Sequence, residues 1–200
     1  MKNLNISTKK IDGVVLRYAE SGDYNKIFTI LTSENKKISL FAPNVKRAKK
    51  GQGAPEVLDI CQFEIIESDE NLNKLKDFKF IENYKNLREN FKKLCVSMTL
   101  MECTNNLIKE YDECKNAFNL IKNTLNVINK ESEELKIFKH LYDCLFSLLV
   151  ILGFEDSKRK LIASKNNLIQ LINKIIEISE TNLKSLNMLM SILPQKKSNM

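Results

Sequence analysis

A cluster of six basic side chains, with no acidic one among them, lies between residues 36 and 50. The cluster consists of Lys36, Lys37, Lys46, Arg47, Lys49 and Lys50. Between residues 56 and 70 the balance reverses, with six acidic side chains and no basic one. Grouped Lys and Arg side chains neutralise phosphates, and a protein whose charge is separated in this way attracts a polyanion to one side. The cluster therefore suggests contact with the phosphate backbone of a nucleic acid. The alternative is a solvated loop whose lysines only keep the protein soluble.

Motifs for other chemistry are missing from the sequence. It has one histidine, His140, and no Gly-x-Ser-x-Gly, Gly-x-x-x-x-Gly-Lys-Ser/Thr or Gly-x-Gly-x-x-Gly pattern. His140 and Cys144 are four residues apart on a predicted helix and could face one metal ion, but a structural zinc needs two more ligands. Cys95, Cys103 and Cys114 form no Cys-x-x-Cys pair. We therefore expect a protein that is not an enzyme, with no metal and no cofactor, and with these side chains in the core.

Five runs of β-branched or aromatic residues predict the strands that position the basic cluster. They are residues 11–18, 26–32, 37–42, 57–67 and 72–80. Ser21-Gly22-Asp23 and Ser33-Glu34-Asn35 supply turns, and residues 46–55 form one long connection. A five-stranded sheet of about 80 residues can satisfy its edges by closing into a small Greek-key barrel, the OB-fold. An SH3-like barrel is the structural alternative.

Beyond residue 80 the hydrophobic period becomes helical, so we predict an α+β protein with an OB-fold domain at 1–80 and a helical domain at 81–200. The first helix is predicted to begin near residue 83. Its apolar face is Leu87, Phe91, Leu94, Met98 and Met101. Further helices are predicted around 117–128, 135–149, 168–178 and 183–193. Gly153 is expected to end the third of these five helices, Thr181 to cap the last and Pro194 to end it.

The composition is that of a globular protein. The 200 residues are 43% hydrophobic, which suffices for a core, and the net charge is +7, so polyanion binding depends on where the charges lie. Five cysteines without close pairing fit a reducing compartment. No secretory signal is visible, and the longest apolar run, 141–152, is shorter than the roughly 20 residues of a membrane span. We expect a soluble cytoplasmic protein without membrane contact.

The order of several short segments resembles the RecO family of bacterial recombination mediators. The segments are Gly13-Val14-Val15-Leu16-Arg17, Gly22-Asp23-Tyr24-Asn25-Lys26, Thr32, Lys37-Ile38-Ser39-Leu40 with Ala42, Lys46-Arg47, residues 72–84, Leu87-Arg88 and residues 138–154. The resemblance implies an OB-fold followed by a helical domain, and binding and annealing of single-stranded DNA. It also implies work with RecR and the single-stranded-DNA-binding protein to load RecA at gaps, hence association with the nucleoid during repair. Residues 154–165 contain no cysteine, so the four-cysteine zinc module of many family members is not expected.

Basic residues at strand ends and in the long connection make up the predicted DNA site. They are Arg17, Lys26, Lys36, Lys37, Lys46, Arg47, Lys49 and Lys50. Tyr24, Tyr18 and Phe41 are aromatic residues on which bases could stack, and each would also suit a core; Tyr24 sits beside a turn and is the one we include in the site. An RNA-associated OB-fold protein is an alternative function, because sequence without the resemblance does not choose between DNA and RNA.

The apolar run after residue 137 predicts a partner-binding groove in the helical domain. Its residues are Phe138, Leu141, Tyr142 and Leu145, with Arg159 and Lys160 as basic flanks. Such a groove would suit an acidic tail that ends in a bulky apolar residue, which is what the resemblance implies for the tail of the single-stranded-DNA-binding protein. Ordinary core packing explains the same run, and a module that only binds proteins is a further alternative.

Overall fold

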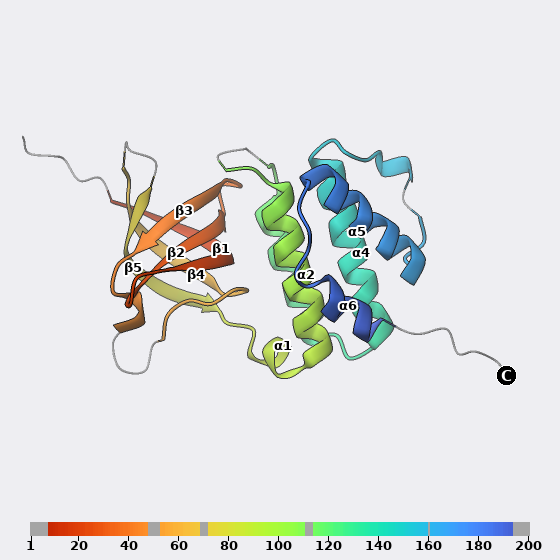
Figure 1. Cartoon of the computed structure of the whole chain (residues 1–200), viewed down its shortest axis with the longest axis horizontal. Helices are drawn as coiled ribbons and strands as arrows, with labels where there is room; N and C mark the ends of the chain where they lie inside the picture. Colours follow the sequence, from red (N-terminus) through yellow and green to blue (C-terminus); the bar gives the residue numbers. More distant parts are fainter. Residues whose placement is uncertain (1–7, 48–52, 69–71, 111–113, 160, 194–200) are drawn as a thin grey trace, which may run out of the picture. The chain divides into compact units, whose positions relative to one another are not determined.

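The computed structural model of this chain describes residues 8–47, 53–68, 72–110, 114–159 and 161–193 (Figure 1). The chain forms two compact units. The first contains Met1–Tyr84 and Ile108–Lys122, and the second contains Lys85–Leu107 and Asn123–Met200. The change from strand to helix near residue 80 was predicted, whereas the return of residues 108–122 to the first unit was not.

Five strands of the first unit form a closed barrel. They are β1 (Thr8–Ser21), β2 (Asn25–Thr32), β3 (Lys37–Ala42), β4 (Ile60–Ile66) and β5 (Asn73–Glu82). Their order around the barrel is β1-β2-β3-β5-β4, and β1 pairs with β4 to close it. All neighbours are antiparallel except β3 and β5, which run parallel. This is the predicted OB-fold, and all five predicted strands are confirmed.

Strand β1 can pair with both β2 and β4 because of two local features. Gly13 faces Thr32 on one side and Cys61 on the other; a Cβ there would lie 3.0 Å from Ile30 Cδ1 and 3.3 Å from the Leu31 carbonyl oxygen, so any larger residue would require these neighbours to shift. Two residues later the pairing with β2 slips by one residue at Leu16. A bulge of this kind reverses which side chains face inward. Val15 faces the core before it, and after it Tyr18 packs against the same core.

Residues 108–122 are fastened to the turn between β2 and β3 through Asn35. The backbone carbonyl of Asn35 accepts a hydrogen bond from the Cys114 N–H at 3.0 Å. Its side-chain oxygen accepts another, at 3.2 Å, from the N–H of Phe118, in the first turn of α3 (Ala117–Lys130). Ser39 Oγ donates to the Glu110 carboxylate at 2.5 Å. One asparagine therefore holds a turn of the barrel and caps a helix distant from it in sequence.

The helical unit contains α1 (Lys85–Glu89), α2 (Phe91–Leu107), α4 (Glu134–Ile151), α5 (Lys165–Ser179), α6 (Leu186–Ile192) and the second half of α3. The expected continuous helix from residue 83 is broken at Asn90, whose side chain accepts a hydrogen bond from the Lys93 N–H at 3.1 Å and so starts α2 afresh. The predicted apolar face is also partly wrong, because Phe91 is 59% exposed. Cys95, Leu100 and Cys103 are fully buried instead, since α2 packs against α4, α5 and α6.

The ends of α4 and α6 are fixed in different ways. Gly153 follows α4 with φ of +79°, and the Phe154 N–H donates to the Leu149 carbonyl at 2.8 Å, which confirms the predicted glycine termination. The expected cap of the last helix by Thr181 is wrong. Helix α6 begins after Ser185, and the Glu102 carboxylate from α2 accepts hydrogen bonds from the backbone N–H groups of Lys184 and Ser185 at 2.8 and 2.9 Å. Leu193, which precedes Pro194, is extended as expected.

All five cysteines are buried as free thiols, as expected. Burial raises the pKa of Cys61 and Cys103, and raises the pKa of Cys144 to about 12. Because the thiolate is the reactive form, we predict that a disulfide-exchange reagent labels almost no thiol in the native protein at pH 8 and five per chain in denaturant. Rapid labelling of one or more thiols under native conditions would contradict this packing.

Candidate nucleic-acid interface

One end of the barrel brings together the β1–β2 turn and the segment that follows β3. The Arg47 guanidinium lies over the Tyr24 ring, with 3.6 Å from its central carbon to the ring centroid. The Lys46 N–H donates to the Tyr24 carbonyl at 3.2 Å, and the Asn44 N–H donates to the Asn25 side chain at 2.8 Å. Tyr24 is 43% exposed and Arg47 is exposed. The arrangement offers a stacked arginine–aromatic pair to solvent, a combination suited to phosphates and unpaired bases.

Two acidic residues balance two of the predicted basic residues at this end. Lys46 forms an ion pair with Glu20. Lys26 is only 5% exposed; its ammonium lies 2.8 Å from the Glu56 carboxylate and 3.7 Å from the centroid of the Tyr18 ring. Lys26 lies on the same side of β2 as the core residues Phe28 and Ile30, so its side chain is in the mouth of the barrel and not on the outer surface. We therefore withdraw Lys26 from the predicted DNA site.

Lys36 and Lys37 lie at the other end of strand β3. The six residues of β3, at about 3.3 Å each, place them about 20 Å from the Tyr24 end. Lys37 is 8% exposed and pairs in a β-bridge with Glu110, so it faces residues 108–122 and not solvent. The structure thus separates the two lysines from Lys46 and Arg47. Lys49 and Lys50 lie outside the described residues.

The outer surface of the sheet extends the Tyr24 end. Arg17 is exposed and lies opposite Thr29, which lies opposite Ser39. The next row across the sheet runs from Ala19 through Ile27 and Phe41 to Lys74 of β5. We call this surface the basic face; it consists of Arg17, Tyr24, Phe41, Lys46, Arg47 and Lys74. Lys74 was missed in the sequence because only the parallel pairing of β3 with β5 places it beside Phe41.

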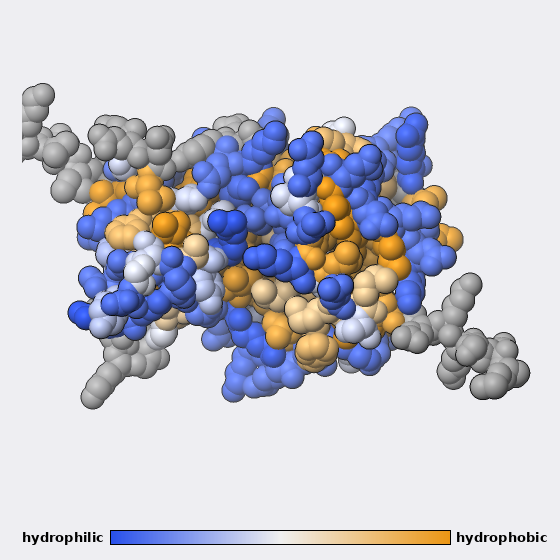
Figure 2. Space-filling view, viewed as in Figure 1, coloured by the Kyte–Doolittle hydropathy of each residue, from blue (hydrophilic) through white to orange (hydrophobic). Residues whose placement is uncertain are grey.

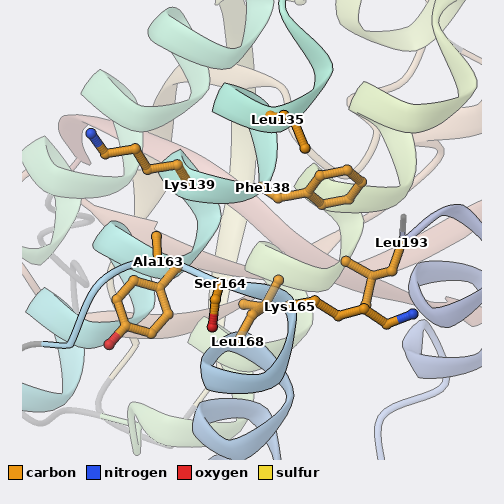
Figure 3. Close-up of a pocket in the computed structure, with 9 residues that line it drawn as sticks. Leu135, Phe138, Lys139, Ala163, Ser164, Lys165, Leu168 and Leu193 are labelled. Carbon is orange, nitrogen blue, oxygen red and sulfur yellow. The ribbon is translucent and has the colours of Figure 1, made fainter. Parts of the chain in front are cut away.

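A separate pocket lies in the helical unit, with a volume of about 190 Å³ (Figure 3). Its lining residues are Leu135, Phe138, Lys139, Tyr142, Ala163, Ser164, Lys165, Leu168 and Leu193. Two predicted partner residues, Phe138 and Tyr142, are in this wall, and Figure 3 shows the Phe138 ring directed toward Leu193. Apolar walls flanked by two lysines suit an acidic peptide with a bulky apolar end.

The other predicted partner residues lie elsewhere. Leu141 and Leu145 are completely buried in the core, so their inclusion in a partner surface was wrong. Arg159 is exposed in a 3₁₀ turn at Ser157–Arg159 and is not among the pocket residues. Lys160 lies outside the described residues. The basic flanks of this pocket are Lys139, which lies next to the predicted apolar run, and Lys165, which the sequence did not indicate.

His140 takes part in a turn and not in a cluster of metal ligands. Its Nε2 lies 3.4 Å from the Glu131 carboxylate, which also accepts hydrogen bonds from the N–H groups of Ser132 and Glu133 at 2.9 Å. The Glu133 N–H is the main cause of the lowered pKa of Glu131. Within the described part of the chain, no three His, Cys, Asp or Glu side chains are grouped to hold a metal ion. No helix there is long and apolar enough to cross a membrane.

Comparison with known proteins agrees with this architecture. Residues 6–84 match the family described as recombination protein O, N terminal. The DNA repair protein RecO of Mycoplasma mycoides subsp. mycoides SC is 31% identical over 183 residues, which cover 87% of this chain and 68% of that protein. The chain belongs to the RecO family of DNA repair proteins. RecO proteins of Gloeothece citriformis and Halalkalibacterium halodurans are each 26% identical, over 73% and 60% of this chain.

The match to RecO proteins is uneven in extent. The chain spans about half the length of the Gloeothece and Halalkalibacterium relatives, 52% and 48%. The match to the N-terminal RecO family includes every strand of the barrel. All six residues of the basic face therefore lie within the part of the chain that matches the N-terminal RecO family.

Proposed function

We propose that this chain binds single-stranded DNA through the basic face and acts in recombination as a mediator without enzymatic activity. The observation that supports this most is the exposed Arg47–Tyr24 stack at the end of an OB-fold barrel in a RecO-family chain. Arginine reaches phosphate with several donors, and an aromatic ring accepts any base. Arg17 and Lys74 continue the positive charge on either side of β2 and β3.

Annealing of complementary strands is the activity that we infer for this surface. An annealing protein must neutralise the phosphates of two strands and leave the base edges free to pair. The basic face meets this requirement because its cations project from an outer sheet surface, and half-buried Phe41 and Ile27 offer no deep base pocket. We further propose that the chain works with RecR and indirectly with RecA, in the bacterial cytoplasm at the nucleoid.

The test of this function is a comparison of nucleic acids. We expect the full chain to bind unpaired DNA more tightly than duplex DNA or structured RNA of equal length, at both about 50 and about 200 mM salt. Fluorescence anisotropy would measure each affinity, and the slope against salt would count the phosphates neutralised, at about 0.7 per contact for single strands. A preference for structured RNA would favour the alternative of an RNA-associated barrel.

We propose that the pocket beside Phe138 binds the C-terminal tail of the single-stranded-DNA-binding protein. Surrounding apolar surface supports the choice: Leu135 is 64% exposed and Ile162 88% exposed, and Figure 2 shows hydrophobic residues gathered on one face of the helical unit. Acidic residues of the tail would lie near Lys139 and Lys165, with the terminal apolar residue in the pocket.

Reversing the charge of a lysine in the pocket wall tests whether the acidic tail binds there. We predict that Lys139→Glu weakens binding of the tail peptide about tenfold, the equivalent of about 1.4 kcal/mol, because a carboxylate would then face an acidic ligand. Lys136→Glu is the matched control, since Lys136 pairs with Glu133 and does not line the pocket. Calorimetry with equal peptide affinities for both variants would reject this site. Affinity for DNA should stay unchanged in both.

A further inference from the structure

A second and larger cavity, of about 580 Å³, lies in the helical unit apart from both surfaces described so far. The junction of α1 and α2, the C-terminal end of α3 and the turn before α4 form its walls. Its lining residues are Asn86, Asn90, Lys92, Lys93, Asn129, Lys130, Glu131, Ser132, Glu134 and Ile137. The lining is almost entirely polar, with three asparagines and three lysines, whereas the pocket beside Phe138 is mostly apolar.

The charges of this cavity leave two lysines for a ligand. Lys92 forms an ion pair with Glu134 at 2.5 Å. Glu131 is occupied by two backbone N–H groups and His140. The Lys93 ammonium donates to the Asn129 backbone carbonyl at 2.9 Å, and no carboxylate partner is found for it in the described part of the chain. Lys130 is exposed, and the described residues give it no ion pair either. The cavity therefore attracts an anion.

The asparagine amides of this cavity need hydrogen-bond partners that a simple anion does not supply. The side-chain oxygen of Asn129 is buried and has no hydrogen-bond partner among the described residues. A buried acceptor without a donor is unfavourable, and Asn129 is a lining residue of the cavity, so a small turn of its amide would bring this oxygen to an N–H or O–H group of a ligand. Asn86 lies in the same wall, and the Asn90 amide nitrogen remains available while its oxygen caps α2. Amide side chains offer a donor and an acceptor together, which matches the edge of a nucleobase.

We infer that this cavity binds one nucleotide, with its phosphate at Lys93 and Lys130 and the edge of its base at Asn129. The volume falls within the range of small-ligand pockets, about 300 to 1,000 Å³. An exocyclic amine, as on adenine, supplies the donor that the Asn129 oxygen lacks. The nucleotide comes either free from solution or as one unit of a bound single strand. This site does not depend on the basic face of the barrel.

Binding of deoxyadenosine monophosphate to the full chain tests the site. We expect Asn129→Ala and Lys130→Ala each to weaken it about tenfold, as measured by calorimetry, with melting temperatures equal to or above that of the parent chain. Retained stability is informative because Asn129→Ala removes an unsatisfied buried oxygen. Lys122→Ala is the control for loss of one charge elsewhere. Unchanged affinity in both cavity variants, or equal affinity for inorganic phosphate, would overturn the inference.

A second arm separates the two sources of the nucleotide. A single-stranded oligonucleotide with a photoreactive adenine is cross-linked to a chain whose basic face has been neutralised, and the labelled peptide is identified by mass spectrometry. Labelling at residues 86–93 or 129–132, lost in Asn129→Ala, supports a nucleotide within a strand even if the free nucleotide binds weakly. Labelling elsewhere, together with no binding of the free nucleotide, rejects the site; binding of an acidic peptide there would reject it as well. Failure of the barrel to bind DNA affects neither readout.

Discussion

Replacing Arg17, Lys46, Arg47 and Lys74 together with alanine is expected to reduce affinity for single-stranded DNA by about 10² to 10³-fold at about 0.1 M salt. Each phosphate contact contributes about 0.7 to the slope of log affinity against log salt, so loss of four contacts flattens the slope by about 3 units. The fold should persist, because Arg17, Lys46, Arg47 and Lys74 are all exposed and the Glu20 partner of Lys46 is exposed too. Anisotropy titrations at several salt concentrations would measure both quantities.

The matched control removes the same charge from the same unit. Lys10, Lys79, Lys109 and Lys115 are exposed and lie outside the basic face. Their replacement by alanine lowers the net charge by the same four units, so a long-range effect of charge would weaken DNA binding equally in both variants. We expect the control to lose less than about tenfold in affinity, since interactions between exposed charges are largely screened beyond about 10 Å at this salt. Equal losses in the two variants would remove the basic face from the mechanism.

Replacing Glu102 with alanine is expected to destabilise the helical unit by about 2 kcal/mol, because loss of a side chain that caps a helix N-terminus costs up to about 2 kcal/mol. The carboxylate accepts from two backbone N–H groups and from the Ser185 hydroxyl, at 2.7 to 2.9 Å. Ser185 provides no side-chain cap of its own to α6, so nothing else in the described chain takes over this role. We expect a melting temperature lower by about 4 to 8 °C.

Two further variants make the Glu102 experiment specific. Glu102→Gln keeps one acceptor oxygen and should lose about half as much stability. Glu177→Ala removes a carboxylate from α5 and should leave the melting temperature almost unchanged. Hydrogen exchange adds a local readout, since faster exchange should be concentrated in α6. A Glu102→Ala chain as stable as Glu177→Ala would show that α6 does not depend on this contact.

Alternation and helical periodicity were enough to predict the five strands and most of the helices, because local side-chain patterns largely determine such elements. The sites required long-range information. Lys26 and Lys46 look alike in sequence, yet only the register of β2 shows that Lys26 points into the barrel mouth toward Glu56. Lys74 lies beside Phe41 because β3 and β5 pair in parallel, and no short sequence motif predicts that pairing. Alternation predicts a residue's face, and tertiary structure decides what covers that face.

The helical unit shows the same division between local and long-range information. The run 138–152 is apolar enough for a groove, but α4 packs against both α2 and α5, and this uses most of its apolar residues. Of the apolar residues in this run, Phe138 and Tyr142, in the N-terminal half of α4, line the pocket described above. The break at Asn90 could have been predicted, since asparagine is a preferred N-cap residue and its side chain accepts a hydrogen bond from the backbone N–H three residues later. The continuous apolar period from Leu87 to Met101 concealed it.

The bulge at Leu16 determines how strand β1 responds to changes of length. Two residues of β1 are spanned there against one of β2, and the extra residue is what directs Arg17 to solvent and Tyr18 to the interior. Loss of the Leu16 codon would make the pairing with β2 regular and leave residues 17–21 on their present sides, because Arg17 would then follow Val15 directly. It would cost the packing of the buried Leu16 side chain and nothing more in the alternation. Loss of one residue between 17 and 21 would instead exchange the two sides for the residues after it, so selection should act more strongly against that deletion than against one at the bulge.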